Sequence, residues 1–288
     1  MKLPQQDFTY RQYMEAADFE LFYYHDHKPP GVDFHNHDFY EIYLFLSGSV
    51  TYVIEGKSYR LKPKDILIIN NRELHKAYVE TGTPYERIVI WLSPDYIKSL
   101  NTDKTNLLGI FDSSLLNRHN LLRLESDSRD YICRIVEKLG VACKSEAFGS
   151  DILRTSYIKE LLVYLNRVQQ ISNGENFELD VTYNDKITKI IHYINQNLDE
   201  DLSLEKLSSK FYLSKYHLLR EFKKNTGYTI HNYITQKRLI MAKELLRDCK
   251  QVSEVCDKCG FGDYSNFIRA FKKEFGISPK KYAKGGQF

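Results

Sequence analysis

The sequence of 288 residues contains no apolar run long enough to cross a membrane as a helix. Its first residues also lack the basic, apolar and small-residue regions of a secretory signal peptide. The hydrophobic fraction of 42% and the charged fraction of 27% are ordinary for a globular protein. We therefore expect a cytoplasmic protein without a membrane partner.

Cysteine is scarce, and the five residues of this type are an odd number. In a chain without secretory features, this argues against a disulfide framework and for reduced thiols. Cys256 and Cys259 form a C-x-x-C pair, but neither a second ligand pair at zinc spacing nor a βαβ pattern accompanies it. We expect these two cysteines to be small buried side chains on a helix.

The net charge of +3 is unevenly distributed along the chain. Residues 183–288 hold 20 Lys and Arg against 12 Asp and Glu, whereas residues 1–182 hold 21 against 26. The length is sufficient for two domains that each bury a core. The C-terminal half is therefore a basic module, as expected for a partner of nucleic acid.

The pattern of apolar residues divides the chain into four segments. Residues 1–93 hold the β-type runs FELFYY, YEIYLFL, VTYVIEG, DILIIN and YERIVIW, separated by turn residues. Residues 94–171 have helical spacing, with a stripe from Ile152 to Val168 that needs a partner surface, either a second protomer or its own β-module. Residues 172–182 have the composition of a linker, and residues 183–288 form a module of short helices. The predicted fold is α+β and multidomain.

The C-terminal module repeats one phrase, since LREFKKNTG at 219–227 returns 49 residues later as IRAFKKEFG at 268–276. Each copy has the pattern of a short helix, a tight turn and a longer helix, which is typical of a helix-turn-helix motif. The residues that mark the helix ends are N-caps, whose side chains accept a backbone N–H, and glycines at which a helix stops. The predicted N-caps are Ser203, Ser214, Asp263 and Ser278, and the predicted C-terminal stops are Gly227 and Gly276.

The longer helix of each copy has one apolar face, formed by Leu218 and Phe222 in the first and by Phe267 and Phe271 in the second. We expect these residues in the core. The basic residues Arg220, Lys223, Arg269 and Lys272 then point elsewhere, as reading of the DNA major groove requires. Two such helices joined by a long helix could reach groove segments about 34 Å apart. The alternative is a solvated basic face on a helical repeat.

These residues resemble the AraC/XylS family of bacterial transcriptional regulators, over about the last 100 residues. LSLEKLSSKFYLSKYHLLREFKKNTGYTIHNYITQKRLIMAKELL resembles the family's first motif with its connector helix, and VSEVCDKCGFGDYSNFIRAFKKEFGISPKKY resembles the second. The resemblance implies double-stranded DNA as a partner and places the base contacts on two sets of residues. These are Tyr216, Leu219 and Arg220 in the first motif, and Tyr264, Ser265, Ile268 and Arg269 in the second.

The stretch GVDFHNHDFYEIYLFLSG at 31–48 carries histidines at alternate positions. On one continuous strand His35, His37, Phe39 and Glu41 would share a face, and His75 would join them from a later strand. The spacing G-x3-H-x-H-x3-E-x6-G followed by P-x-D-x9-H resembles the two cupin motifs, which implies a small β-barrel sensor domain. His35, His37, Glu41 and His75 would suit a divalent transition metal. The same residues, with Phe39 and Tyr43, could instead bind an organic effector such as a sugar without a metal.

We therefore expect an effector-responsive, sequence-specific transcriptional regulator rather than an enzyme. We expect a homodimer, in which the apolar stripe around Leu153 to Val168 pairs with a second protomer. The resemblance implies a sugar as effector and, as the family's commoner mode, activation of carbohydrate-utilisation genes, which involves RNA polymerase. One alternative is a metal-dependent cupin enzyme, an isomerase or dioxygenase, with an accessory DNA-binding tail, although no separate acid-base pair can be assigned. Another is an architectural DNA binder, which leaves the β-module unexplained.

Overall fold

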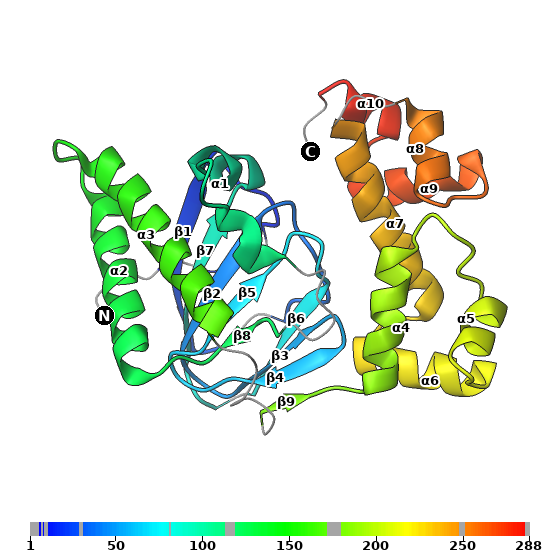
Figure 1. Ribbon diagram of the computed structural model, residues 1–288, viewed down its shortest axis with the longest axis horizontal. Helices are drawn as coiled ribbons and strands as arrows, with labels where there is room; N and C mark the ends of the chain where they lie inside the picture. The colour runs from blue at the N-terminus through cyan, green and yellow to red at the C-terminus, as the bar shows by residue number, and fades with distance from the viewer. Residues whose placement is uncertain are drawn as a thin grey trace. The chain divides into compact units, whose positions relative to one another are not determined.

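The computed structural model describes residues 6, 8, 11–28, 31–80, 82–112, 119–171, 180–247 and 251–285. The chain divides into two compact units, Met1–Thr182 and Tyr183–Phe288. The first consists of β-strands followed by helices, and the second is helical (Figure 1). The predicted α+β fold class is confirmed.

The first unit is built on two antiparallel sheets. The larger has the strand order β1-β7-β2-β5-β8 and the smaller the order β6-β3-β4-β9. The strands are β1 (Phe19–Asp26), β2 (Tyr40–Ser47), β3 (Val50–Ile54), β4 (Lys57–Arg60), β5 (Ile66–Ile69), β6 (His75–Val79), β7 (Tyr85–Leu92), β8 (Leu121–Leu122) and β9 (Val181–Thr182). The five runs predicted as strands correspond to β1, β2, β3, β5 and β7.

Side chains alternate across the larger sheet and form two separate cores. Ile42 of β2 and Ile90 of β7 belong to the core shared with the helices. Tyr43 of β2 and Trp91 of β7 belong to a second core, which includes residues of the smaller sheet. The core between the sheets is therefore lined by one face of β2 and β7, and the predicted effector residues Glu41 and Tyr43 lie on this face.

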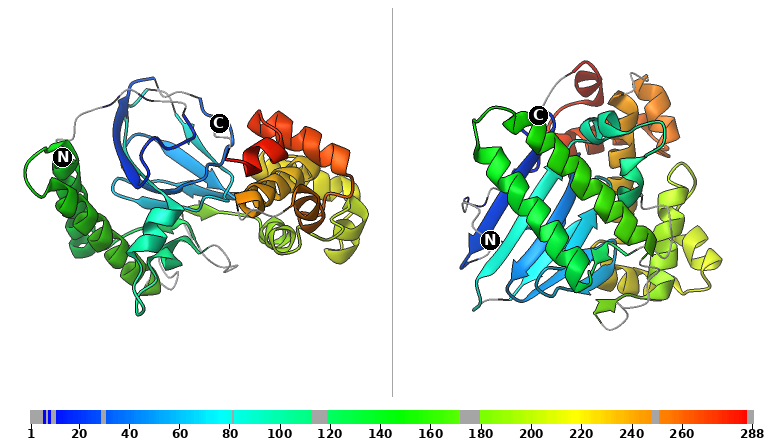
Figure 2. Two further views of the ribbon diagram at one scale, coloured as in Figure 1. Left: turned by 90° about the horizontal axis from the view of Figure 1, so that it is seen from above. Right: turned by 60° about the vertical axis from the view of Figure 1, so that its left-hand side comes forward.

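The helices of the first unit cover the outer face of the larger sheet. They are α1 (Pro94–Leu100), the 3-10 helix η1 (Leu107–Phe111), α2 (Ser126–Lys144) and α3 (Ser150–Ile171). Figure 2 shows α2 and α3 side by side across this face. Leu161 and Leu165 are fully buried there, whereas Ile152 and Leu153 stay exposed. Most of the predicted stripe therefore packs on its own sheet, and burial of each leucine contributes about 1.5 to 3 kcal/mol.

The segment that leads to the second unit is attached to the smaller sheet, whereas residues 172–182 were predicted as linker. Val181 and Thr182 form β9, pair with Tyr59 and Ser58 of β4, and bury the Val181 side chain. The rest of that predicted linker, residues 172–179, lies outside the described residues. Similarly β8, within the predicted helical segment 94–171, pairs with β5. Two-residue strands carry too little periodicity to be recognised in a sequence.

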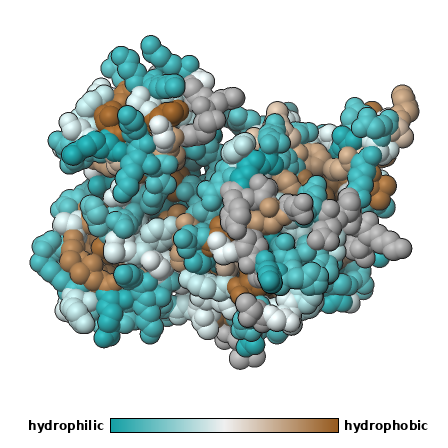
Figure 3. Space-filling model, turned by 180° about the vertical axis from the view of Figure 1, so that it is seen from behind, coloured by the Kyte–Doolittle hydropathy of each residue, from teal (hydrophilic) through white to brown (hydrophobic). Residues whose placement is uncertain are grey.

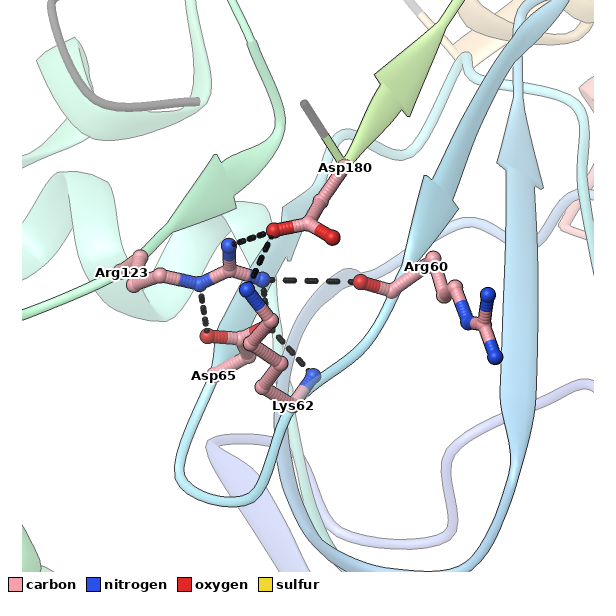
Figure 4. A network of polar contacts seen from close by, with 5 residues as sticks. All are labelled: Arg60, Lys62, Asp65, Arg123 and Asp180. Carbon is pink, nitrogen blue, oxygen red and sulfur yellow. Dashed lines mark hydrogen bonds and ion pairs between the residues drawn. The ribbon is translucent and has the colours of Figure 1, made fainter. Parts of the chain in front are cut away.

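A cluster of charged side chains holds the residue just before β9 (Figure 4). The Arg123 guanidinium donates to both carboxylate oxygens of Asp65, at 2.9 and 2.6 Å, and also to Asp180. Lys62 Nζ donates to the Asp180 carboxylate at 2.6 Å. The Asp180 carbonyl accepts the Arg60 backbone N–H at 2.9 Å. The chain is therefore held to the first unit immediately before the second unit begins.

The second unit contains the helices predicted from the repeat. They are α4 (Asp185–Gln196), α5 (Leu204–Lys210), α6 (Lys215–Thr226), α7 (Ile230–Arg247), α8 (Val252–Lys258), α9 (Tyr264–Phe275) and α10 (Pro279–Ala283). The four predicted N-caps, Ser203, Ser214, Asp263 and Ser278, each accept a backbone N–H of the first turn. Gly227 and Gly276 end α6 and α9 in the left-handed conformation, with φ of 77° and 72°.

The C-x-x-C cysteines lie in the core of the second motif. Cys256 is on α8, Cys259 follows the last residue of that helix, and both are buried among apolar side chains. Burial raises the pKa of Cys256, and raises that of Cys259 to about 12. Both thiols therefore remain protonated near neutral pH, as expected for packing residues. The described cysteines Cys133, Cys143, Cys256 and Cys259 are all free of disulfides.

Candidate functional site

Two helix-turn-helix motifs occupy the second unit, α5 with α6 and α8 with α9. The apolar residues predicted to anchor α6 and α9, namely Leu218, Phe222, Phe267 and Phe271, are fully buried. Each long helix is therefore fixed by one face. The opposite face is available for a partner.

The residues predicted to bind DNA lie mostly on the free faces. Those exposed on α6 are Tyr216, Leu219, Arg220 and Lys223, and those exposed on α9 are Tyr264, Ser265, Arg269 and Lys272. Ile268 differs because it is partly buried and packs against the core of the second motif. Each motif thus presents a tyrosine at the first or second residue of the helix, an arginine one turn later and a lysine beyond it.

Local polar contacts only weakly restrain the two arginines. Arg220 pairs with its neighbour Glu221 at 3.3 Å, and Arg269 donates to the side chain of Asn266. Exposed ion pairs are worth about 0 to 1 kcal/mol. Both guanidinium groups can therefore turn toward a DNA base or phosphate at small cost.

The connector helix α7 belongs to the cores of both motifs. Tyr233 packs edge-on against Phe222 of α6, with ring centroids 5.3 Å apart. Further along α7, Leu239 and Leu246 join Phe271 in the core of the second motif. Arg238 of α7 donates to the carbonyls of Leu198 and Glu200, at 2.9 and 2.7 Å, in the loop before α5. The spacing between the two recognition helices is therefore set by one rigid element.

The first unit brings three of the four predicted ligands together between its sheets. The donor atoms of His37, Glu41 and His75 all lie within 4.8 Å of one another. The three residues are 4%, 6% and 0% exposed. His37 Nε2 lies 3.4 Å from Glu41 Oε2. We call these three residues the interior triad.

His35 lies beside the interior triad and differs from the predicted arrangement. Because β2 begins only at Tyr40, His35, His37 and Phe39 are not on one continuous strand with Glu41. His35 instead pairs with His75 through two backbone hydrogen bonds of 3.1 and 3.0 Å. Bends at Asp38 and Phe39 separate that bridge from β2. His37, Phe39 and Glu41 are nevertheless all buried toward the same interior.

Burial and the neighbouring histidines control the charge of two of these rings. Desolvation lowers the pKa of His75 well below its usual value, and His35 and His37 lower it further. The pKa of His35 is lowered by burial and by His37. His75 is therefore a neutral imidazole near pH 7, with one ring nitrogen available as an acceptor or ligand.

Aromatic residues surround the interior triad. Two of them, Trp91 and Tyr85, make hydrogen bonds that no sequence pattern reveals. The ring of Phe39 stacks on His37, with centroids 3.8 Å apart, and lies 4.4 Å from the ring of Trp91. Trp91 Nε1 donates to Glu41 Oε2 at 3.0 Å, because β2 and β7 pair these residues directly. Tyr43, on the same face, shares a hydrogen bond with Tyr85. The contributions of Trp91 and Tyr85 depend on strand register, which the sequence does not display.

Residues 19–162, half of the chain, match the family described as AraC-like ligand binding domain. The chain belongs to the AraC family. Residues 207–285 of this AraC-family chain match a helix-turn-helix domain. It is 27% identical over 257 residues to the HTH-type transcriptional activator RhaS of Salmonella schwarzengrund (strain CVM19633), with 87% of each chain covered. It is 26% identical over 252 residues to RhaS of Enterobacter sp. (strain 638), again with 87% of each covered.

A solved structure resembles part of this AraC-family chain. The C-terminal domain of the two-component response regulator yesN from Fusobacterium nucleatum is 36% identical, with 33% of this chain and 94% of that chain covered, at a TM-score of 0.32.

Membership of the AraC family establishes the general activity of this protein. It is an effector-responsive, DNA-binding transcriptional regulator, with a ligand-binding domain and a helix-turn-helix domain on one chain. The relatives are activators, which argues against the cupin-enzyme alternative. The ligand-binding domain accounts for the β-module that an architectural DNA binder would leave unexplained. No described helix is both long and apolar enough to span a membrane.

Proposed function

We propose that this protein is a transcriptional activator that recognises its operator through the first turns of α6 and α9 and responds to a sugar bound between the sheets. The observation that carries the DNA-binding part is the matched exposure of Tyr216, Arg220, Tyr264 and Arg269 on two anchored helices. The names of the relatives support activation, and with it contact to RNA polymerase.

The composition of the interior supports a polyhydroxylated effector. Imidazole and carboxylate groups of the interior triad can hydrogen-bond to hydroxyls, and the rings of Phe39 and Trp91 offer apolar faces beside them. Tyr43 and His35 complete the set proposed to bind the effector. A thermal-shift screen of mono- and oligosaccharides, followed by operator binding with each hit, tests this assignment. A panel in which no sugar raises the Tm or changes DNA binding contradicts it.

Arg269→Ala is expected to weaken binding to the selected operator by about 1 to 3 kcal/mol, if the guanidinium makes a bidentate contact to guanine. Arg269→Lys is the matched control, because it keeps the charge and loses the planar fork. We expect it to lose most of the specific affinity while keeping its salt dependence. Fluorescence anisotropy across a panel of sites and salt concentrations measures both. Unchanged binding by Arg269→Ala at every site would remove Arg269 from the readout.

We also propose a homodimer, formed through the tip of the α2–α3 hairpin. Phe148 is fully exposed there, Val141 and Ile152 are 67% and 65% exposed, and Leu153 is 45% exposed. At this tip, at the upper right of Figure 3, apolar surface is exposed beside hydrophilic surface. Exposed apolar side chains that cluster in this way are typical of protein interfaces.

Replacing Phe148 and Ile152 together by serine is expected to raise the dimer dissociation constant by at least about 100-fold, since each buried apolar side chain contributes about 1.5 to 3 kcal/mol. Light scattering after size exclusion measures the change. Tyr212→Ser, at an exposed aromatic residue of the second unit, is the control and should leave the mass unchanged. A double variant that dimerises like the wild type would place the interface elsewhere.

A further inference from the structure

The turns of the two helix-turn-helix motifs have closely similar backbone structures. Phe211 and Cys259, the C-caps of the short helices α5 and α8, have φ of −99° and −90°. The next residue in each turn, Tyr212 or Gly260, donates its N–H to the carbonyl three residues earlier, at 3.3 and 3.0 Å. Both of these residues have positive φ, 53° and 71°. Tyr212 therefore occupies the place in the first motif that glycine occupies in the second.

Tyrosine is an unfavourable residue at this place in the turn. The left-handed backbone costs free energy for a residue with a Cβ, whereas glycine adopts it routinely. Burial of the side chain does not offset this cost, because Tyr212 is 95% exposed. Backbone strain of this kind concentrates at functional sites. The tyrosine side chain therefore contributes little to folding, and its exposure suits a contact with a partner.

The position of Tyr212 in the motif brings its side chain to the DNA backbone. It precedes Ser214, the N-cap of α6, by two residues, and the exposed Tyr216 lies in the first turn of that helix. A helix with its side chains is about 10 to 12 Å across, and the major groove is about 12 Å wide. A helix in the groove thus fills it from one strand to the other. A side chain that protrudes just before the helix lies against a sugar-phosphate strand.

The charge around this turn favours a phosphate as the partner. Residues 210–224 hold five Lys and Arg against one Glu. Lys210 lies two residues before Tyr212 and Lys215 three residues after it, and both are exposed. The phenol hydroxyl can donate a hydrogen bond, and tyrosine is among the residues that contact phosphate oxygens in protein–DNA complexes.

We propose that the hydroxyl of Tyr212 donates a hydrogen bond to a phosphate of the operator, beside the groove segment that α6 enters. This inference rests on the proposed function, because it requires α6 to lie in the major groove. It adds a contact that sets the position of α6 along the DNA without reading the base sequence. Because the second motif has Gly260 at the matching place, the contact belongs to the first motif alone.

Tyr212→Phe tests the hydroxyl, since it keeps both the ring and the backbone strain. We expect it to unfold at the same urea concentration as the wild type and to bind the selected operator about 10-fold more weakly, at the low end for a hydrogen bond to a charged group. The loss should be equal across operator sequences, and the salt dependence should not change because no charge is removed. Fluorescence anisotropy measures both. Tyr13→Phe, at a tyrosine of the first unit that is 58% exposed, is the matched control and should bind normally.

Tyr212→Gly separates DNA binding from stability. Glycine relieves the left-handed strain, so the DNA-binding unit should unfold at a higher urea concentration, even after the larger entropy of the unfolded chain is counted. Operator affinity should nevertheless fall at least as far as for Tyr212→Phe. A residue with a purely structural role would change both quantities in the same direction.

Ethylation interference locates the contact on the DNA. Ethylation of one phosphate beside the α6 segment should inhibit the wild type and have no further effect on Tyr212→Phe. Wild-type affinity in Tyr212→Phe would overturn the proposal, and reduced transcription at unchanged affinity would place the contact on RNA polymerase instead. If Arg269→Ala lowers specific affinity and Tyr212→Phe does not, the proposed function stands without this contact. If the wild type selects no DNA site, the proposed function itself fails, and the Tyr212 contact fails with it.

Discussion

Gly260→Ala is expected to destabilise the DNA-binding unit by about 2 to 5 kcal/mol. Gly260 has φ of +71°, in the left-handed region, where a residue with a Cβ pays about 1 to 2 kcal/mol. An ideal Cβ there would also overlap the Leu198 carbonyl oxygen and lie 2.8 Å from a terminal nitrogen of Arg238. Overpacking of this kind costs about 1 to 3 kcal/mol. Urea unfolding of the full chain, followed by circular dichroism, measures the loss in the transition of the DNA-binding unit.

The clash has a functional consequence, because the overlapping groups set the spacing of the two motifs. Arg238 on α7 holds the loop before α5 through Leu198 and Glu200, and Gly260 lies in the turn between α8 and α9. A side chain at 260 must push these groups apart. We therefore expect Gly260→Ala to lose operator affinity even at temperatures where it stays folded.

Gly262→Ala is the matched control. Gly262 lies two residues further along the same turn, and a Cβ there would have no neighbour within 4 Å. Its effect should stay within about 0.5 kcal/mol, as for most surface substitutions. Equal unfolding midpoints for Gly260→Ala and the wild type would show that the turn relaxes without strain.

The C-terminal motifs could be predicted in detail because their signals are local. The N-caps at Ser214 and Asp263 and the C-terminal stops at Gly227 and Gly276 depend on a few neighbouring residues. Each signal also occurs in both copies of the repeat. The apolar spacing of Phe222 and Phe271 identified the buried face for the same reason.

The contacts that assemble each unit could not be predicted, because they join residues distant in the sequence. The Trp91 hydrogen bond to Glu41 follows from the register of β2 on β7, and the His35 to His75 bridge follows from the placement of β6. The spacing of His35, His37 and Glu41 suggested one strand, whereas two bends precede β2. The interior triad was therefore predicted as a set of residues, and its geometry was not.

Arg123→Ala is expected to destabilise the first unit, which carries the ligand-binding domain, by about 2 to 3 kcal/mol and to reduce the effector response on DNA. The change leaves the carboxylate of Asp65, which is almost fully buried, without its bidentate partner. Breaking a fully buried pair costs about 3 to 5 kcal/mol. The loss here is smaller because Arg123 is partly exposed and Asp65 keeps the backbone N–H of Lys62 at 2.7 Å. Thermal unfolding of the first unit measures this part of the effect.

The effect on signalling follows from the position of Asp180. It pairs with Arg123 and Lys62 directly before β9, and β9 is followed by the first residue of the DNA-binding unit. Val181 of β9 lies in the same buried core as Trp91 and Tyr43 of the proposed effector site. A change in that core on effector binding can therefore reach the segment that leads to α4, provided that β9 stays attached.

Asp180→Asn separates signalling from stability, because it weakens the attachment of β9 and leaves the Asp65 pair intact. We expect a stability loss of about 1 kcal/mol, since these ion pairs are partly exposed to solvent and the asparagine amide keeps an oxygen that can accept hydrogen bonds. The affinity for effector and the affinity for operator without effector should both be retained. The change in operator affinity that effector causes should become smaller. This result would be a loss of coupling free energy between two intact sites. Anisotropy titrations of operator DNA with and without effector measure that coupling. A full response in both Asp180→Asn and Arg123→Ala would mean that the effector signal does not pass through β9.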